Sequence, residues 1–517
     1  MSTTVQFRMD PRSSQSADLI LSEACRKAGK YPNQIGSLEI VHRSIDSRRR
    51  DVWVDFSVRL YDAGEAQQSR RGFEFKAVPS SAQAIIVGSG PAGLFAALQC
   101  LECGLRPVVL ERGAQVEQRR AKITALMRDG IIDPNTNYCY GEGGAGTYSD
   151  GKLYTRSTKR GDVSKVLGQF VSCGASPEIL YDAHPHLGSD KLPHIVAAIR
   201  QMIIGNGGEL HFDSKVTGLV RKDGAVIGAV TEKGEEFSGP VILACGHSAE
   251  DVFRFLDEEA IEQECKGIAC GVRLEHPQKL IDMMQYKGHP QFLPPAEYSF
   301  VTQVQGRGVY SFCMCPGGVI VPAVTQEGTI SVNGMSASAR SGAFANSAMV
   351  VEIRPEDLPA RFAQYGQFAM LEFVRALEKR TFEFSDGTLA APAQRMGDFT
   401  ESMRSESLMR TSYVPGVVNS NLNALLPPFI SARLREGLKH FGSCARGFLT
   451  NDAMLLASET RTSSPVRIVR DEQTMMSPSA DGLFPCGEGA GYSGGIVSSA
   501  LDGMNCALAL EKYLKRE

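Results

Sequence analysis

A glycine-rich turn has the GxGxxG spacing that can place backbone amides around a phosphate. It consists of Gly88, Ser89, Gly90, Pro91, Ala92 and Gly93. An apolar run at 84–87 precedes it and a helical pattern at 94–104 follows, so the turn leads from a buried strand into a helix. The first glycine allows the tight turn, the second leaves room for a pyrophosphate, and the third lets the helix pack closely on the strand. Together with the amides at the helix N-terminus, this pattern predicts a dinucleotide site.

An acidic residue at the end of the next expected strand fits the same site. The apolar run 106–110 ends at Glu111, eighteen residues after Gly93, and Arg112 follows it. A carboxylate at this position can accept hydrogen bonds from both ribose hydroxyls of an adenosine, and it would repel a 2′-phosphate. We therefore expect Glu111 and Arg112 to contact the cofactor.

A second glycine-rich segment, near the C-terminus, indicates which dinucleotide this is. Residues 482–496 read as a short strand and a Gly-Glu pair, and a turn then leads into a helical run at 497–514. NAD needs only the first strand–helix–strand unit, whereas the ribityl chain and isoalloxazine of FAD require a second contact. The acid would bond a ribityl hydroxyl, and the helix N-terminus would face the flavin carbonyls. The sequence thus predicts FAD, with contacts from Gly487, Glu488, Gly494, Gly495 and Ile496.

Two further parts of the chain are expected to border the FAD. Residues 208–216 and 241–246 are strand-like, and this architecture brings them beside the adenine and the pyrophosphate at Val216, Ala244 and Gly246. The glycines of 141–146 match a nucleotide loop loosely, but no apolar strand precedes them, so we interpret them as a loop that wraps the first FAD contact. Its contacting residues would be Gly143, Gly144, Ala145 and Thr147.

Longer motifs add a family resemblance. They lie at residues 88–93, 140–153, 312–318, 333–336, 459–468 and 487–488. In their order along the chain and in their residues, these motifs resemble the family of uncharacterised bacterial FAD-dependent dehydrogenases, which has organellar relatives in plants. The resemblance covers nearly the whole chain and implies an FAD protein of glutathione-reductase-like topology with a large inserted domain. The family has no agreed substrate to transfer.

The expected fold class is α/β, with a discontinuous Rossmann-like FAD-binding domain. We assign residues 1–79 to a small α+β N-terminal domain, residues 80–249 and 459–517 to the FAD-binding domain, and residues 250–458 to an inserted mixed α/β substrate domain. In the first of these, 14–30 reads as a helix, and 35–44 and 51–60 alternate like half-buried strands.

The inserted domain holds two residue types that suit substrate chemistry. His276 could act as a general base because the ordinary pKa of histidine lies near neutrality, although a histidine before a proline is also a common structural residue. Arg340 could hold a substrate carboxylate with two hydrogen bonds, or it could pair with an acidic neighbour. No other segment joins a strand to GxGxxG, so a built-in site for NAD(P)H is not expected. The external electron donor or acceptor would be NAD(P)H sharing the flavin pocket, or another protein or small molecule.

The chain has 13 cysteines, an odd number, and its start is polar, which favours a reducing cytoplasm and free thiols. Cys100 and Cys103 fall in the helix after the glycine turn, where we expect packing. Cys313 and Cys315 fall in an apparent strand and share one face, with thiols about 7 Å apart. That separation is too great for a disulfide unless the strand bulges. We keep this pair as candidates for catalysis or substrate contact, beside a packing role.

Composition excludes some functions. With 55 Lys and Arg against 58 Asp and Glu, the net charge of −3 gives no field for coating a nucleic acid or an anionic membrane. The longest apolar stretch is too short and too interrupted by glycine to cross a bilayer. No metal site is expected. As an alternative to the flavoenzyme, the basic run 48–50 could let the N-terminal domain hold RNA, although a solvated connection explains the same run.

Overall fold

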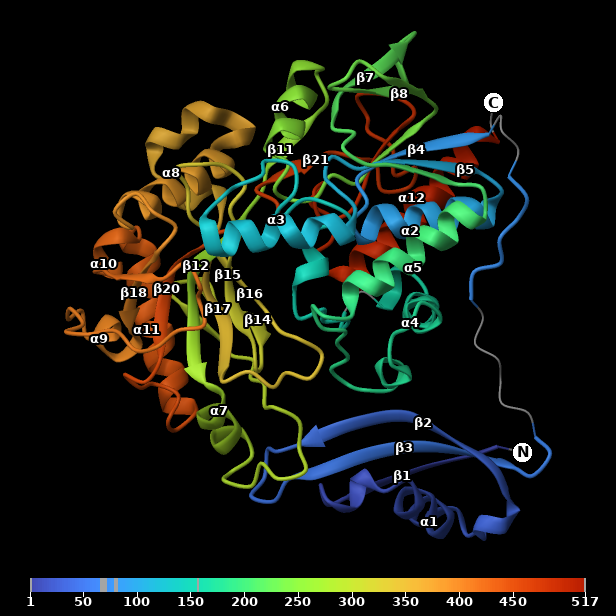
Figure 1. Cartoon of the computed structure of the whole chain (residues 1–517), viewed down its shortest axis with the longest axis vertical. Helices are drawn as coiled ribbons and strands as arrows, with labels where there is room; N and C mark the ends of the chain where they lie inside the picture. The colour runs from blue at the N-terminus through green and yellow to red at the C-terminus, as the bar shows by residue number, and fades with distance from the viewer. Residues whose placement is uncertain (1, 66–71, 79–81, 156–157, 516–517) are drawn as a thin grey trace.

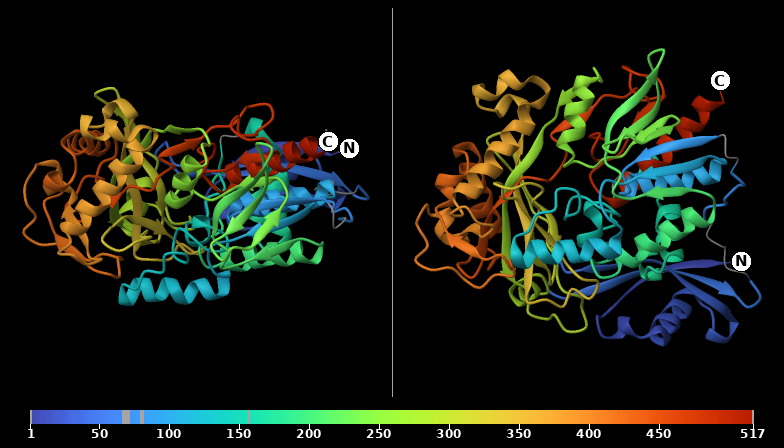
Figure 2. Two further views of the ribbon diagram at one scale, coloured as in Figure 1. Left: turned by 90° about the horizontal axis from the view of Figure 1, so that it is seen from above. Right: turned by 45° about the horizontal axis from the view of Figure 1, so that its top comes forward.

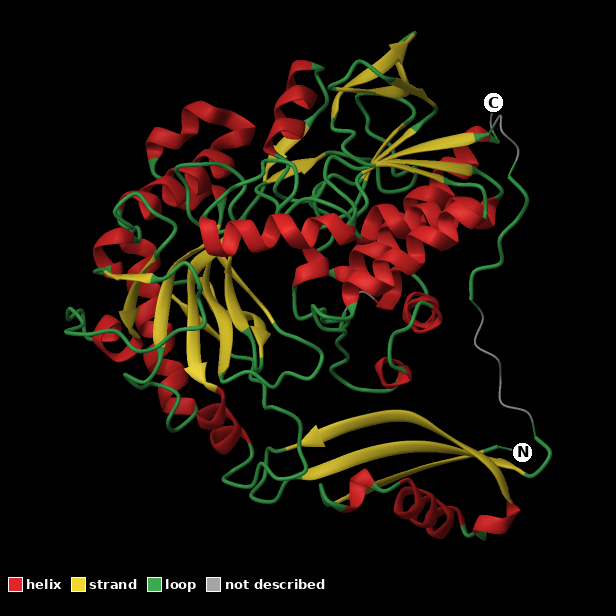
Figure 3. Cartoon of the chain, viewed as in Figure 1, coloured by secondary structure: helices red, strands yellow, loops and turns green. Residues whose placement is uncertain are grey.

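The computed structural model describes residues 2–65, 72–78, 82–155 and 158–515. The described strands form six sheets, and Figure 1 and Figure 3 show the larger ones with helices packed beside them. In both views of Figure 2 the parallel sheet, whose strands at 83–87 and 106–110 are light blue, and the large mixed sheet (yellow to orange) lie toward opposite sides of the molecule. The fold class is α/β, as the sequence predicts.

The N-terminal part is a three-stranded antiparallel sheet with one helix on a single face. Its elements are β1 (Thr3–Met9), α1 (Ala17–Ala28), β2 (Ile35–Asp46) and β3 (Trp53–Asp62), with sheet order β1-β3-β2. In β3 every second residue from Val54 to Leu60 is buried against α1, which is the alternation that the sequence shows. The strand β1 was not predicted. Arg43 joins this sheet to the rest through two hydrogen bonds to Asp182, at 2.6 and 2.9 Å.

A five-stranded parallel sheet carries the glycine motifs. Its strands, in the order β22-β10-β4-β5-β6, are Leu483–Pro485, Val241–Leu243, Gln83–Val87, Arg106–Leu110 and Glu209–His211. One face packs on the helices α2 (Pro91–Cys103), α4 (Val163–Ser172), α5 (Leu192–Gly205) and α12 (Ile496–Leu514). The other face packs on α6 (Glu250–Glu258) and on the antiparallel strands β7 (Val216–Lys222), β8 (Ala225–Thr231) and β9 (Glu236–Ser238).

The sequence of β4 explains why both faces are covered. Ala84 and Ile86 point to the helical face, and Ile85 and Val87 point to the face covered by β7 and β8. A strand that buries both sets reads as a continuous apolar run. The helices α2 and α12 lie against each other, since a Cβ added at Gly503 would be 2.0 Å from the Ala92 carbonyl oxygen. Their N-termini therefore reach the same end of the sheet.

The inserted part is built on a seven-stranded sheet, in the order β13-β14-β17-β12-β20-β18-β19. These strands are Val301–Val304, Arg307–Cys315, Phe344–Ile353, Ile268–Pro277, Met454–Glu459, Ala391–Arg395 and Val417–Asn419. Helices α7 (Gln278–Gln285), α8 (Ala369–Glu383), α9 (Met396–Thr400), α10 (Leu422–Leu425) and α11 (Pro428–Cys444) accompany it. Two small pairs, β11 (Gln263–Cys265) with β21 (Val466–Ile468) and β15 (Val319–Pro322) with β16 (Val332–Met335), complete the strands.

The helix α3 (Val116–Asp129) runs between the parallel sheet and the inserted sheet (Figure 1). In the described part of the chain, no helix is both long enough and apolar enough to cross a membrane. The domain boundaries given above remain predictions.

Candidate functional site

A cavity of about 370 Å³ lies where the predicted cofactor loops converge. Strands β4, β5, β10 and β22 direct their carboxyl ends toward it, as expected for an open parallel sheet. Most of the residues predicted to contact the cofactor line this cavity. They are Gly88, Gly90, Pro91, Ala92, Glu111, Arg112, Gly144, Ala145, Val216, Ala244, Gly246, Glu488, Gly494, Gly495 and Ile496.

Five other predicted contacts lie just behind the lining. They are Ser89, Gly93, Gly143, Thr147 and Gly487; four of them make hydrogen bonds within the protein, and Gly93 packs against the Gly88 carbonyl. The Ser89 hydroxyl donates to Glu111 Oε2 at 2.7 Å, and the Gly487 amide donates to Asp502 Oδ2 at 2.7 Å. The Gly143 amide donates to the Ser89 carbonyl at 3.0 Å, and the Thr147 hydroxyl donates to the Glu142 carbonyl at 3.2 Å. The structure therefore places these residues as supports of the loops.

The glycines of the cofactor loops fall into two groups, according to what a side chain at each position would meet. A Cβ at Gly88 would lie 2.4 Å from the Ala244 carbonyl oxygen, and one at Gly93 would lie 1.9 Å from the Gly88 carbonyl oxygen. The protein itself forbids side chains there. At Gly90 an added Cβ would meet only the Cα of Gly144, at 3.9 Å, and at Gly494 it would meet nothing within 4 Å. These two positions face space that the chain leaves open.

The carboxylate of Glu111 is buried and binds the loops that surround the cavity. Its Oε2 accepts from the Ser89 amide and hydroxyl, and its Oε1 accepts from the amides of Gly113 and Gly141, at 2.9 and 3.2 Å. Arg119, which is fully buried, holds the same loop from the other side. Its guanidinium donates to the carbonyls of Asn137, Tyr138, Gly141, Glu142 and Gly144.

Two polar residues that sequence reasoning missed also line the cavity. His247 and Ser248 follow β10, and His247 Nε2 and Ser248 Oγ are buried without a hydrogen-bond partner. Burial lowers the pKa of His247 to about 4, so its imidazole is neutral at pH 7. Its Nδ1 lies 3.8 Å from Glu488 Oε1, and burial raises the pKa of Glu488 to about 7. The feature of the sequence that could have identified His247 and Ser248 is their position directly after a strand, at the carboxyl edge of a parallel sheet.

A second cavity, of about 530 Å³, adjoins the first. The two share six lining residues, which are Arg112, Tyr140, Lys215, His247, Ser248 and Arg461. Its other walls come from α6 and α8, and its arginines have acidic partners: Arg375 donates to Glu250 at 2.9 Å, and Arg461 donates to Glu378 at 2.9 Å. The lining of this cavity thus carries charged groups of both signs, beside apolar residues.

Comparison with known sequences decides the family. The family described as FAD-dependent protein, C-terminal domain-like, matches residues 267–462, an FAD binding domain matches residues 83–132, and a domain of unknown function matches residues 1–61. A Clostridium beijerinckii protein described as uncharacterized is 38% identical over 513 residues, covering 95% of each chain. The chain belongs to this family of FAD-dependent proteins.

Solved structures resemble the FAD-dependent protein only distantly. A geranylgeranyl bacteriochlorophyll reductase-like protein of Thermoplasma acidophilum is 13% identical, with a TM-score of 0.36, over 84% of this chain and 79% of that one. CtdE in complex with FAD is 12% identical, with a TM-score of 0.33, over 83% and 85%. With such low scores, neither likeness carries anything further.

The cavity of this FAD-dependent protein fits its cofactor. The open positions at Gly90 and Gly494 each adjoin a helix N-terminus, that of α2 and that of α12, where backbone amides and the helix dipole favour anionic or carbonyl oxygens. Glu111 and Glu488 lie in the same lining, as the ribose and ribityl contacts require. FAD is the cofactor, and these residues would hold it.

The structure does not bring His276 to the cavity of the FAD-dependent protein. The residue lies on β12 near the centre of the seven-stranded sheet and is fully buried. Its Nε2 is 2.8 Å from the Phe448 carbonyl, its ring lies 4.9 Å from that of Phe448, and burial lowers its pKa to about 4. Its position corrects the expected placement of a general base, because a side chain sealed among aromatic rings has no path to a substrate.

Arg340 pairs with an acidic neighbour, which was the second of the two interpretations that its sequence position allowed. It is buried, it does not line the cavity, and its guanidinium donates to both carboxylate oxygens of Asp150, at 3.0 and 2.5 Å. Asp150 itself lines the cavity, together with Lys152. Arg340 therefore acts on the site through Asp150, and its Nη1 also lies 3.8 Å from Glu297, the carboxylate that pairs with Lys152.

Cys313 and Cys315 differ from the regular strand that the sequence suggested. Cys313 lines the cavity, whereas Cys315 is fully buried behind it. Phe312 pairs with Ala348 and Cys315 pairs with Asn346, so the strand β14 uses one more residue than β17 at this point. Such a bulge breaks the alternation on which the separation of about 7 Å depended. By contrast, Cys100 is packed in α2 as expected.

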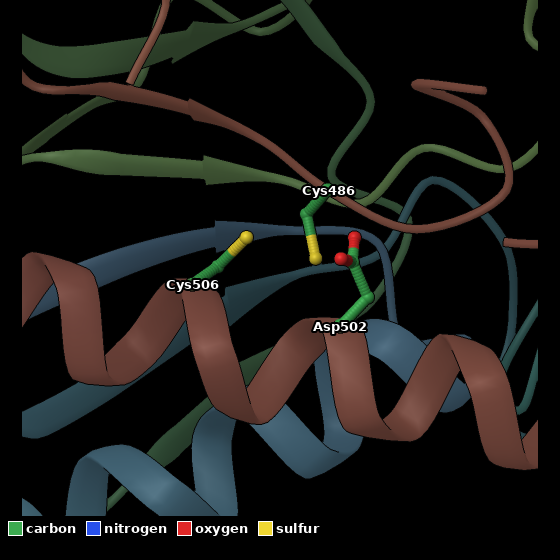
Figure 4. A group of neighbouring side chains, drawn as sticks. All are labelled: Cys486, Asp502 and Cys506. Carbon is green, nitrogen blue, oxygen red and sulfur yellow. The ribbon is translucent and has the colours of Figure 1, made fainter. Parts of the chain in front are cut away.

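Two remaining clusters give no ligand site. Figure 4 shows Cys486, Asp502 and Cys506 converging between the end of β22 and α12, close enough together for a metal ion. The Arg470 guanidinium already donates to both oxygens of Asp502, at 2.7 and 2.9 Å, and a cation there disfavours a metal.

In the basic run 48–50, Arg48 donates to Asp46 at 2.8 and 3.0 Å, and neither this contact nor the comparisons support binding of RNA.

Proposed function

We propose that this FAD-dependent protein is an oxidoreductase that exchanges a hydride, or two electrons, between the N5 position of FAD and a small molecule. Bound FAD would supply the two-electron chemistry. The observation that carries the proposal is the meeting of two parts of the chain at one cavity. Gly494 and Gly495 come from the flavin-contacting turn, and Phe312, Cys313 and Asn333 come from the inserted strands and their flanks.

The residues of this chain can manage a proton beside the flavin. Glu488 has a pKa raised by burial to about 7, so near neutral pH it can hold or release a proton. His247, whose pKa burial lowers to about 4, stays neutral and offers an unpartnered Nε2. Lys152 also lines the cavity, and its Nζ lies 3.6 Å from the Glu297 carboxylate, which balances its charge within the protein.

The partners would be a small-molecule substrate and an external electron donor or acceptor, either NAD(P)H or another protein. In the residues that the structure describes, the five-stranded sheet is the one sheet of parallel strands with a glycine turn at its edge. A nicotinamide would therefore have to approach the flavin cavity itself or the adjoining cavity.

An anaerobic screen of donors tests the proposal. The purified protein is expected to be yellow and to release FAD on denaturation. NADH, NADPH and small metabolites are then added separately without oxygen, with free FAD as the control. Loss of flavin absorbance with the protein, much faster than with free FAD, supports an oxidoreductase and names the donor class. A colourless protein that takes up no FAD would overturn the proposal.

A further inference from the structure

The bulge in β14 changes how Cys313 and Cys315 face each other. Cys313 adopts a positive φ of 47°, which is rare for a residue other than glycine, asparagine or aspartate. The Sγ of Cys315 donates back to the carbonyl oxygen of Cys313 at 3.3 Å. Both cysteine side chains thus lie within one turn of irregular backbone, and each is the strongest influence on the protonation of the other.

A buried arginine holds this arrangement. The Nη2 of Arg273 donates to the Cys313 carbonyl at 2.8 Å and to Cys315 Sγ at 3.3 Å, and its Nε donates to Asn346 Oδ1 at 2.8 Å. Arg273 is fully buried, and Glu459 lies 3.4 Å from its Nη1. The Gly334 backbone packs closely on the guanidinium, because an added Cβ at Gly334 would be 2.1 Å from Nη2. The positive charge therefore stays fixed beside the sulfurs.

This environment favours one thiolate and one thiol. The hydrogen bond from Cys315 and the charges of Arg273 and Lys152 lower the pKa of Cys313, against the effect of burial. The same interaction and burial raise the pKa of Cys315. A thiolate next to a thiol is the state from which a dithiol forms a disulfide.

The two sulfurs also differ in access. Cys313 lines the cavity with Glu488, Gly494 and Gly495, and it lies close enough to Glu488 to influence its protonation. Cys315 lies behind Cys313 and does not line the cavity. Cys313 is therefore the cysteine of the pair that borders the cavity predicted to hold the flavin, and Cys315 is the one that lies behind it.

We propose that Cys313 and Cys315 form a redox-active pair that exchanges two electrons with the bound FAD. The inference rests on the proposed function and names a dithiol as a partner of the flavin. The Cys313 thiolate and the Cys315 thiol join through a new Sγ–Sγ bond, and the S–H bond of Cys315 breaks. Two electrons and one proton pass to oxidised FAD, and the reverse transfer from reduced FAD reopens the disulfide. Arg273 acts as a positioning residue.

Counting electrons in the holoenzyme tests the pair without any knowledge of the substrate. Oxidised holoenzyme is titrated anaerobically with dithionite. The wild-type protein is expected to take up about four electrons per FAD, two for the flavin and two for the disulfide. The variants Cys313→Ser and Cys315→Ala should take up about two, with unchanged FAD content. Cys103→Ser, from the other closely spaced pair, should still take up about four.

Mass spectrometry after alkylation supplies an independent readout. A peptide with the Cys313–Cys315 disulfide should be found in oxidised holoenzyme and should disappear on reduction. In the half-reduced protein, a thiolate beside the flavin should add a long-wavelength absorption band that Cys313→Ser abolishes. Uptake of about two electrons by the wild type, with both thiols free, overturns the inference. That result leaves the proposed function standing, because the donor screen tests it separately.

Discussion

Arg340 and Asp150 form a buried ion pair in which both carboxylate oxygens are bound, at 3.0 and 2.5 Å. Arg340 comes from the inserted part and Asp150 from the loop after the wrapping glycines, so the pair ties the two parts together at the edge of the cavity. A guanidinium engaged in this way stabilises the site and is not free to hold a substrate carboxylate.

Replacement of this arginine should therefore reduce stability first. Arg340→Met leaves a buried carboxylate without its partner, and we expect a loss of about 3–5 kcal/mol in the free energy of unfolding. Urea denaturation measures it. Arg354→Met breaks an ion pair that is more exposed, with Glu352 at 2.6 Å, and should cost at most about 1 kcal/mol. A stable Arg340→Met protein with weakened substrate binding would instead return Arg340 to the role of substrate clamp.

The two kinds of glycine in the first turn should behave differently on substitution. Gly90→Val puts methyl groups into the open cavity, so we expect a folded protein without FAD. Gly93→Ala forces a Cβ against the Gly88 carbonyl and should destabilise the FAD-free protein by about 1–3 kcal/mol or more. FAD content and the unfolding midpoint of the FAD-free protein separate the two effects. Normal FAD content in Gly90→Val would place the pyrophosphate elsewhere.

The free energy of unfolding of the FAD-free protein should depend on pH because Glu488 titrates. Its pKa is raised from an ordinary 4.5 to about 7, so the folded protein binds this proton more tightly than the unfolded chain does. The stability that comes from the proton is complete below a pH of about 4.5 and is lost as the pH rises to about 7.

Glu488→Gln should therefore gain stability relative to the wild type through this window and then level off. Unfolding midpoints measured from about pH 5 to about pH 8 give the comparison. The variant Glu436→Gln, at an exposed position, is the control, and its stability difference from the wild type should not grow across this pH window. A constant difference between Glu488→Gln and the wild type would place the ionisation of Glu488 outside the window.

The cluster of Cys486, Asp502 and Cys506 should function without a metal ion. Because Arg470 occupies both oxygens of Asp502, a chelator should leave the unfolding midpoint unchanged, and elemental analysis should find no stoichiometric metal. Arg470→Met should lower the free energy of unfolding by about 3–5 kcal/mol, since the buried Asp502 carboxylate then keeps the Gly487 amide but has lost its cationic partner. Stoichiometric zinc that Cys506→Ser removes would contradict this prediction.

Local patterns in the sequence were enough to predict the cofactor and its cradle. The spacing of Gly88, Gly90 and Gly93 with Glu111, and the later Gly487–Glu488 turn, specify strand ends and helix N-termini within short stretches of chain. The conformations of such stretches depend mainly on neighbouring residues, so the parallel sheet and the lining of the cavity followed from them. The sequence also predicts a discontinuous FAD-binding domain, because both glycine segments are expected to contact one cofactor, and the boundaries of that domain stay a prediction.

The chemistry above the flavin depended on contacts between distant residues. Only the tertiary structure sealed His276 behind Phe448, paired Arg340 with Asp150, and left His247 at the cavity with an unpartnered nitrogen. Sequence periodicity predicted a regular strand at 312–315, and the bulge arises only where that strand pairs with β17. Register, burial and ion pairing are decided by which segments pack together, which no single stretch of sequence specifies.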